Sequence, residues 1–182
     1  MTDWLLDTPL AAERLDCAQT IRSSGDALMV IINDILDFSK IESGKLSLEL
    51  LDFDLPTFLD RVLALFGERA QRKGLLLTSR IAEDVPSGLC GDPARLQQIL
   101  SNLLANAIKF TERGHVQVRA RIFDGAVLVE VQDTGIGIPP ERQATLFHAF
   151  QTTADQKRFL RPGLGLGLSI SSAIVDAMAG SI

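Results

Sequence analysis

A long stretch without proline, from Ala11 to about Leu46, is the feature that most constrains how this chain folds. Apolar residues recur in it at seven-residue spacing, as at Ile21, Leu28 and Ile35, and this spacing predicts one long helix with a broad apolar stripe. Gly25 weakens such a helix by roughly 1 kcal/mol relative to alanine. A lone helix cannot bury the stripe, so we expect it to pair with a second copy of the chain. The alternative is a helix that lies on the core of its own domain.

The residues after this helix combine strands and helices. Asp92 stands directly before Pro93 and is a candidate helix N-cap, and Pro56, which Asp54 precedes by two positions, sits at a plausible first helical position. Asp124-Gly125 separates two alternating apolar segments, which is a strong hairpin signal. Helices are predicted at 57–72, 92–110, 140–147 and 167–178, and strands at 46–55, 75–81, 115–123 and 126–133. This order predicts an α+β fold with helices on one face of a largely antiparallel sheet.

Composition and charge narrow the class of protein. With 182 residues, of which 46% are hydrophobic, the chain can form one domain with an appended element, or two small domains. Its net charge of -5 argues against general nucleic-acid binding. The longest apolar run, Ala27–Ile32, cannot span a bilayer, and the N-terminus lacks the features of a signal peptide. We expect this segment in the cytoplasm without membrane contact, and a membrane anchor elsewhere in a longer parent protein is left open.

The predicted helix at 92–110 carries the first group of candidate site residues. Asn102 and Asn106 are four positions apart and share a face. An amide oxygen suits magnesium, which also keeps water and phosphate oxygens as ligands. Lys109 follows within reach of a phosphate, with Phe110 beside it. The alternative is a buried amide pair that is satisfied by neighbouring backbone.

A second group follows a predicted strand, in the segment 133–139. Asp133 at the strand end is well placed to accept a hydrogen bond from an exocyclic amine such as that of adenine. Gly135 and Gly137 let the backbone approach a ligand closely. A Rossmann fingerprint is excluded, because its third glycine would stand at Pro140. The alternative for this group is a surface turn.

A third group, the glycine-rich segment 163–168, leads into the last predicted helix. Backbone N–H groups at a helix N-terminus form an anion site. The preceding polar segment, 151–162, is expected to fold over the ligand as a lid. A Walker loop is excluded, because Gly44-Lys45 is followed by Leu46 rather than by serine or threonine.

The order of these groups carries a family resemblance. Asn-x-x-x-Asn-x-x-Lys, Asp-x-Gly-x-Gly, Phe147-x-x-Phe150 and Gly-x-Gly-x-Gly resemble the N, G1, F and G2 boxes of sensor histidine kinases. Residues 92–180 resemble their catalytic ATP-binding domain. Residues 21–25 and 31–42 resemble the second helix of their dimerisation domain, most closely that of hybrid kinases in bacterial phosphorelays. We therefore expect a partial dimerisation hairpin at 1–48 and the ATP-binding domain at 49–182.

The resemblance implies a long dimerisation helix followed by a two-layer α/β sandwich of the type shared with gyrase and the Hsp90 chaperones. Asn106 would be the magnesium ligand, with Asn102 beside it near the phosphates. Lys109 would contact phosphate, Phe110 would border the nucleotide, and Asp133 would bind the adenine amine.

Further site residues follow from the same resemblance. Gln98, one turn before Asn102, stands where some relatives carry an acid. A glutamine cannot act as a general base, but it can orient the acceptor. Gln98, Asn102 and Lys109 are thus the catalytic candidates. The remaining nucleotide-binding and lid candidates are Gly135, Gly137, Ile138, Phe150, Gly163, Gly165, Leu166, Gly167 and Leu168.

The implied function is transfer of the γ-phosphoryl group of ATP, with Mg²⁺, to a histidine. The implied partners are a second copy of the chain, a phosphoacceptor histidine domain and the receiver domain of a response regulator in a two-component system. The phosphoacceptor motif itself is missing, and we expect His115 and His148 to be structural or surface residues. The chain is therefore expected to act on a histidine only in trans.

Both ends and the lid depart from the family pattern. Residues 1–6 resemble the tail of the first dimerisation helix, and the family continues into two closing strands beyond 182, so we expect a fragment of a longer kinase. In the lid, Arg161-Pro162-Gly163-Leu164 replaces the usual Gly-Gly-Thr-Gly, which removes a hydroxyl and an N–H donor. Three alternatives stay open: an ATP-binding module that no longer transfers, a dimerisation module, and an ATPase or chaperone of the wider fold.

Overall fold

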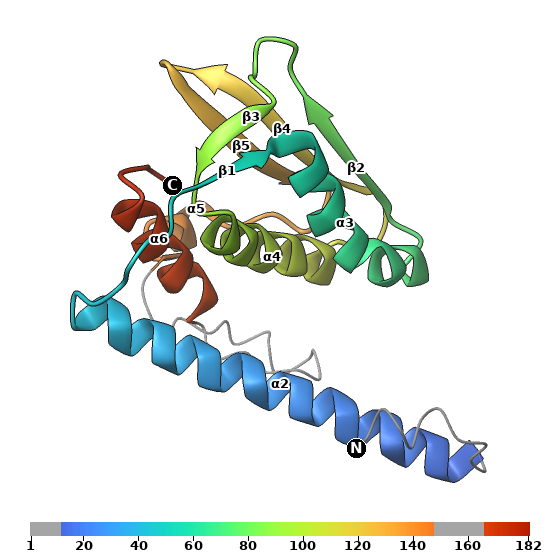
Figure 1. Cartoon of the computed structure of the whole chain (residues 1–182). Helices are drawn as coiled ribbons and strands as arrows, with labels where there is room; N and C mark the ends of the chain where they lie inside the picture. Colours follow the sequence, from blue (N-terminus) through green and yellow to red (C-terminus); the bar gives the residue numbers. More distant parts are fainter. Residues whose placement is uncertain (1–11, 148–165) are drawn as a thin grey trace.

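The computed structural model describes residues 12–147 and 166–182 (Figure 1). The elements are α2 (Ala12–Glu42), β1 (Leu51–Asp54), α3 (Leu55–Arg72), β2 (Leu76–Ile81), β3 (Gly88–Gly91), α4 (Pro93–Phe110), β4 (His115–Phe123), β5 (Ala126–Asp133), α5 (Pro140–Gln143) and α6 (Gly167–Ala177). In Figure 1 the strands form an upper layer, α3 and α4 lie beneath them, and α2 runs along the bottom. The α+β class predicted from the sequence is confirmed.

The long helix α2 ends where the sequence predicts an exit. Gly44 has a φ of 63°, a left-handed conformation that costs glycine little. Its N–H donates to the Ile41 carbonyl over 3.0 Å, and the Lys45 N–H donates to the Lys40 carbonyl over 2.8 Å. These two bonds form a Schellman motif, which satisfies carbonyls that a helix end would otherwise leave unpaired.

The main sheet contains β2, β4 and β5, with β4 in the centre. Strands β4 and β5 form an antiparallel hairpin in which Phe123 lies opposite Ala126. Asp124 and Gly125 connect them with φ values of 49° and 76°. Positive φ at both positions is the signature of a type I′ turn, whose twist matches that of the strands. The hairpin prediction is therefore confirmed.

Several details of the predicted fold are wrong. Strand β2 pairs parallel to β4, so the sheet is mixed rather than largely antiparallel; α4 lies in the crossover connection that a parallel pair requires. The unpredicted strand β3 has glycine at both ends and pairs with β1. The strand predicted at 46–55 shortens to the four residues of β1, because β3 pairs with no more of it. Helix α5 also has only four residues and ends well before residue 147.

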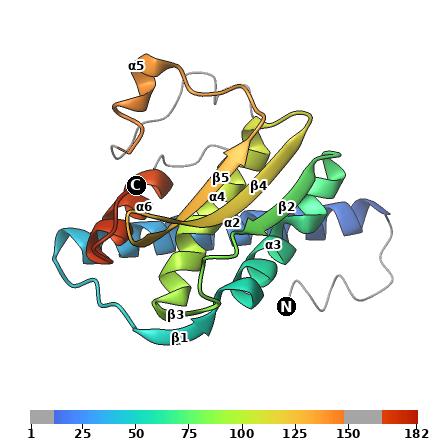
Figure 2. The same cartoon turned by 90° about the horizontal axis from the view of Figure 1, so that it is seen from above.

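The larger core lies between the main sheet and the helices α3 and α4. Val116, Val118 and Ala120 point into it from β4, while Arg119 and Arg121, which alternate with Ala120, are exposed. This alternation is the expected pattern of a strand with one buried face. Leu104 and Ile108 of α4 are fully buried against it. Seen from above, β4 and β5 cross over α4, β2 lies beside α3, and α2 runs beneath (Figure 2).

A smaller core holds α6 between α4 and the C-terminal part of α2. Ile99, Ile170 and Ile174 are buried in it, and Phe38 and Ile41 of α2 pack against it. This end of α2 therefore lies on the core of its own domain, which was the alternative to pairing with a second chain. None of the helices in the described ranges combines the length and the hydropathy of a membrane-spanning segment.

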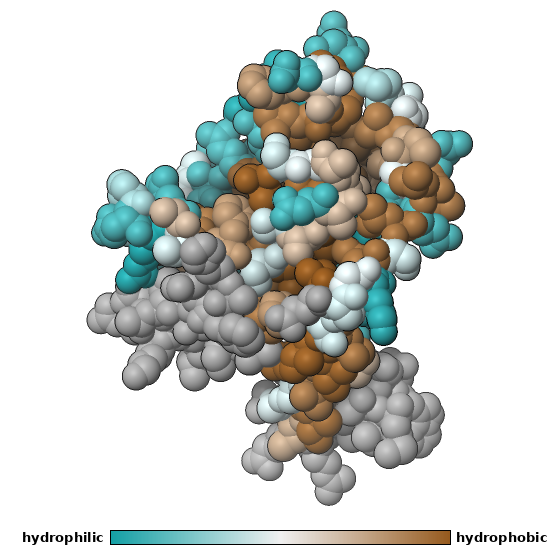
Figure 3. Space-filling view, turned by 90° about the vertical axis from the view of Figure 1, so that its left-hand side faces the viewer, coloured by the Kyte–Doolittle hydropathy of each residue, from teal (hydrophilic) through white to brown (hydrophobic). Residues whose placement is uncertain are grey.

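Three further residues of the α2 stripe are exposed to solvent. Ile21, Leu28 and Ile35 are 61%, 56% and 51% exposed. In the space-filling view, hydrophobic side chains gather on the lower part of the molecule, where α2 lies (Figure 3). The expected pairing with a second chain thus stays a prediction, and it concerns this stripe.

Asp92 fastens the start of α4. Its carboxylate accepts from the backbone N–H of Arg95 over 3.0 Å and from that of Glu49 over 2.9 Å, and the residue is only 4% exposed. Burial alone would raise the pKa of Asp92, but hydrogen bonds from Glu49, Arg95 and Ala94 and the charge of Arg95 outweigh it, so the pKa is lowered. Asp92 is therefore a charged N-cap, as predicted, which also holds the segment before β1.

Replacing Asp92 with alanine should lower the free energy of unfolding at neutral pH by about 1–2 kcal/mol, because α4 loses its cap. A lowered folded pKa means that this stabilisation is present above the unfolded pKa, near 4. It is lost as pH falls through the folded pKa. Urea unfolding at neutral pH and near pH 3 checks this. The difference between wild type and Asp92→Ala should shrink at acid pH, and an equal difference at both would contradict a charged cap.

Candidate functional site

Helix α4 carries both asparagines of the first candidate group and presents Asn102 toward α6. The Asn102 amide nitrogen donates to the Ser171 hydroxyl over 3.0 Å. The partner is thus a side chain of another helix, rather than the neighbouring backbone that the buried-pair alternative requires. The Asn106 side chain is half-buried, and within the described ranges no protein group hydrogen-bonds to it. Its amide oxygen can therefore accept a further ligand.

Gly167 allows α6 to begin directly against Asn102. A Cβ atom at this position would lie 2.3 Å from the Asn102 amide oxygen, so any side chain would displace that amide. Leu166 before it is buried and anchors the start of the helix, while Leu168 is half-buried. The start of α6 has no side-chain cap. Among the described residues, no side chain accepts from its first N–H groups, and these groups can bind an anion beside Asn102.

The second candidate group, after β5, folds against the end of α4. The Gly135 N–H donates to the Asp133 carboxylate over 2.8 Å, and the Thr111 hydroxyl lies 3.5 Å from the same oxygen. The Ile136 N–H reaches the Phe110 carbonyl at 3.4 Å. A Cβ atom on Gly135 would lie 2.6 Å from that carbonyl oxygen, so only glycine permits this approach. One carboxylate oxygen of Asp133 is thereby oriented, and the residue stays exposed.

Apolar surface is left open on the same loop. Ile136 is 77% exposed and Ile138 is 46% exposed. The Ile138 carbonyl accepts from the Gln143 side chain over 2.9 Å, which ties the loop to α5. Gly137 between the two isoleucines has a φ of 70°. The exposed carboxylate of Asp133 thus shares its loop with two exposed apolar side chains, a combination that suits a flat ligand with a polar edge.

Lys109 and Phe110 lie together at the end of α4. The Lys109 ammonium stands 5.0 Å from the centroid of the Phe110 ring, a cation–π distance. Burial and, after it, the positive charge of Arg69 lower the pKa of Lys109. Both effects penalise an isolated cation. An anion bound beside Lys109 would relieve that penalty, so the position favours a phosphate.

Gln98 lies away from this group, where α4 meets α2. Its amide nitrogen donates to the Asp37 carboxylate over 2.7 Å, and its amide oxygen accepts from the Arg95 guanidinium over 2.8 Å. Arg95 also pairs with Asp37 at 3.1 Å. Burial and the charge of Asp37 raise the pKa of neighbouring Asp34. Gln98 therefore belongs to a polar contact between the long helix and the domain, which the sequence alone did not predict.

Sequence reasoning missed two residues that hold the site together. Ser171 stands four positions after Gly167 on α6, and this spacing could have placed it on the face that meets Asn102. Thr111 carries no local signal for its contact with Asp133. Of the predicted candidates, Phe150, Gly163, Gly165, His148 and the segment 161–164 lie outside the described residues. His115 begins β4, and its N–H donates to the Thr134 hydroxyl over 3.0 Å.

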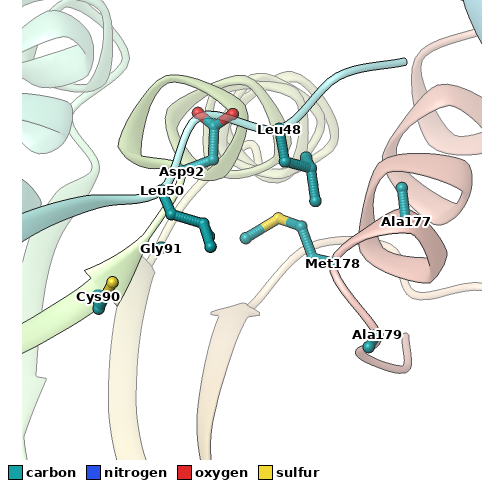
Figure 4. A pocket seen from close by; sticks show the side chains of 8 residues that line it. All are labelled: Leu48, Leu50, Cys90, Gly91, Asp92, Ala177, Met178 and Ala179. Carbon is teal, nitrogen blue, oxygen red and sulfur yellow. The ribbon is translucent and has the colours of Figure 1, made fainter. Parts of the chain in front are cut away.

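Two shallow hollows in the described part of the chain lie apart from the candidate group. One, of about 230 Å³, is formed between the segment before β1, the end of β3 and the end of α6 (Figure 4). Leu48, Leu50 and Met178 make its surface mainly apolar. The other, of about 270 Å³, lies over Arg80, Arg119 and Arg121 on the sheet. Neither hollow is lined by Asn102, Asn106 or Asp133. The candidate site is therefore defined by the hydrogen bonds between its segments and not by either hollow.

Comparison with curated proteins identifies relatives along the whole chain. Signal transduction histidine-protein kinase BarA of Escherichia coli (strain K12) is 45% identical over 182 residues, covering 97% of this chain and 20% of that protein. Sensor protein GacS of Pseudomonas syringae pv. syringae is 43% identical over 187 residues, covering 100% and 20%. Histidine kinase 3 of Arabidopsis thaliana is 36% identical, covering 100% and 22%. The chain spans about a fifth of the length of these relatives.

Solved structures and a family model agree with these relatives. Full-length ShkA in complex with AMPPNP superposes with a TM-score of 0.80 at 36% identity, covering 98% of this chain and 37% of that one. The catalytic domain of histidine kinase ThkA gives 0.61 at 30% identity, covering 71% and 82%. The model "Histidine kinase-, DNA gyrase B-, and HSP90-like ATPase" matches residues 91–182. The chain therefore belongs to this ATPase family and, within it, to the sensor histidine kinases.

Proposed function

We propose that this chain binds ATP with magnesium and transfers the γ-phosphoryl group to a histidine outside the chain. The observation that carries the proposal is the convergence of three separate segments. Asn102 of α4 meets Ser171 of α6 at 3.0 Å, and Phe110 of α4 meets Ile136 of the loop after β5 at 3.4 Å. These contacts bring three groups into one region: the side-chain amide of Asn102, the N-terminus of α6 and the exposed carboxylate of Asp133. The match to an ATPase family supports the nucleotide as ligand.

We assign the binding of the adenine base to the loop after β5. The carboxylate of Asp133 accepts a hydrogen bond from the exocyclic amine of adenine, which guanine does not offer at that position. Gly135 and Gly137 keep the backbone close to the ring, and Ile138 and Phe110 supply apolar contact. The orientation of Asp133 by the Gly135 N–H, at 2.8 Å, supports this assignment.

The phosphates are assigned to the end of α4 and the start of α6. Within the described ranges, no group of three or more His, Cys, Asp or Glu side chains could hold a metal ion. A single neutral oxygen from Asn106 fits Mg²⁺, which commonly binds through few protein ligands together with water and phosphate oxygens. Asn102 lies one turn away. Lys109 and the N–H groups that lead α6 from Gly167 neutralise phosphate charge.

Transfer itself needs positioning more than covalent work from the protein. The bond between the γ-phosphorus and the bridging oxygen of ATP breaks, a bond to an imidazole nitrogen forms, and ADP leaves. We assign Gln98 to orienting the acceptor histidine, because Gln98 lies where α4 meets α2.

The proposed domain division is a dimerisation segment at 1–48 and an ATP-binding domain at 49–182. The further partners are a phosphoacceptor domain and a receiver domain.

A specific observation also favours pairing of two chains. The exposed side chains of Ile21, Leu28 and Ile35 stand at seven-residue spacing on α2, which is the pattern of a helix that packs against another. The alternative function is that of a transfer-inactive module for nucleotide binding or dimerisation. Such a module would use the same exposed surface of α2.

ATP should bind to the chain in calorimetry, and omission of Mg²⁺ should weaken the binding. Asp133→Ala should reduce the affinity at least about tenfold, because the adenine amine loses a charged acceptor. Asn106→Ala should remove most of the magnesium dependence. Asp124→Ala, at the exposed tip of the hairpin, serves as the matched control and should bind as wild type. Equal affinities with and without Mg²⁺ would count against the metal assignment.

Phosphoryl transfer should be detected when radiolabelled ATP is supplied together with a separate histidine-bearing dimerisation domain. Lys109→Met should reduce the rate about a hundredfold, because a cation at the transferring group is lost. The rate should also fall as pH drops below about 6.5, because the acceptor imidazole must be neutral. ATP binding without any labelling would favour the transfer-inactive alternative.

The mass of the chain in sedimentation equilibrium should rise with concentration toward that of a dimer. Replacing Ile21, Leu28 and Ile35 with glutamine should keep it monomeric, because each side chain contributes roughly 1.5 kcal/mol or more when it is buried. Asn33→Gln, on the same helix and also exposed, serves as control. If the wild-type chain stays monomeric at high concentration, the proposal that α2 mediates dimerisation is contradicted.

A further inference from the structure

The C-terminus of α4 is held by a lysine from another helix. Lys73 follows the last residue of α3, and its ammonium donates to the carbonyls of Ile108, Lys109 and Thr111 at 2.6, 3.0 and 3.2 Å. The last carbonyls of a helix have no partner within the helix, and the helix dipole places partial negative charge there. Three short contacts from one cation satisfy both needs at once.

These carbonyls belong to the same helix end as Lys109 and Phe110, which we assign to the nucleotide. The backbone leaves the helix at Thr111, which has extended φ and ψ of -98° and 120° and is fully buried. This bend directs the Phe110 carbonyl toward the Ile136 N–H at 3.4 Å. It also directs the Thr111 hydroxyl toward the Asp133 carboxylate at 3.5 Å. Lys73 is thus two contacts away from the carboxylate that is assigned to adenine.

The same arrangement leaves Lys109 available. A lysine in the last turn of a helix commonly bonds the terminal carbonyls, but here those carbonyls already accept from Lys73. The Lys109 ammonium instead lies over the Phe110 ring, 5.0 Å from its centroid. Lys73 also offsets the negative end of the α4 dipole, which would otherwise repel a phosphate near Lys109.

We propose that Lys73 is a positioning residue for the nucleotide. It does not touch the ligand. It holds the end of α4 in the conformation that presents Lys109 and Phe110 and that keeps Asp133 oriented through Thr111. This inference rests on the proposed function, because it presupposes that adenine binds at Asp133.

The test measures dissociation constants for ATP and GTP by calorimetry, at a temperature where every variant is folded. Lys73→Met should weaken ATP binding roughly tenfold and reduce the preference for ATP over GTP. Lys73→Arg, which keeps a cation with several donors, should recover most of that preference. Lys45→Met removes an exposed lysine from the end of α2 and should change neither quantity.

A double variant separates positioning from general stability. If Lys73 acts through the loop that carries Asp133, then Lys73→Met should change the ATP/GTP preference little when Asp133→Ala is already present. A lower melting temperature with unchanged ATP affinity and unchanged base preference would show that Lys73 only caps the helix, and would overturn the proposal. Failure of the wild-type chain to bind ATP would overturn the proposed function instead, so the two failures are distinguishable.

Discussion

The burial of α4 between the main sheet and α6 is the constraint on which the rest of the structure depends. Leu104 and Ile108 pack into the sheet core, while Ile99 packs against α6. Hydrogen bonds to other segments hold its two ends: the N-cap Asp92 accepts from the Glu49 N–H, and Lys73 donates to the last carbonyls. A helix that is packed on two sides and capped at both ends cannot rotate or slide without loss of burial. Its polar residues therefore keep fixed positions relative to the loops that face them.

The long helix is joined to this domain by both apolar and polar contacts. Phe38 and Ile41 pack on the smaller core, and Asp37 accepts from Arg95 and Gln98 of α4. The ion pair is largely withdrawn from water, so it is screened less than a surface pair, and its geometry restricts how the two parts meet. The contact between Asp37 and Gln98 thereby fixes the orientation of α2 relative to α4, the helix that bears Asn102 and Asn106.

The sequence predicted the elements whose signals are local. Asp92-Pro93 marks the start of α4, Asp124-Gly125 marks the hairpin, and Gly44 marks the end of α2, because each depends on backbone conformations that few residue types favour. The parallel pairing of β2 with β4 was not predicted, because register between strands far apart in sequence is set by packing. Strand β3 was missed for a related reason: a four-residue segment that is bounded by glycines carries no periodicity to detect.

For the site, the sequence by itself determined which chemistry is available and in what order. The two asparagines four positions apart, the aspartate before paired glycines and the glycine-rich entry to the last helix are local patterns, and they carry the family resemblance that the comparisons confirm. Only the tertiary structure decided which groups meet. Asn102 bonds Ser171, Gln98 turns to Asp37, and Lys73 caps α4. Such contacts join residues distant in the chain, and their geometry follows from packing of the helices rather than from any local preference.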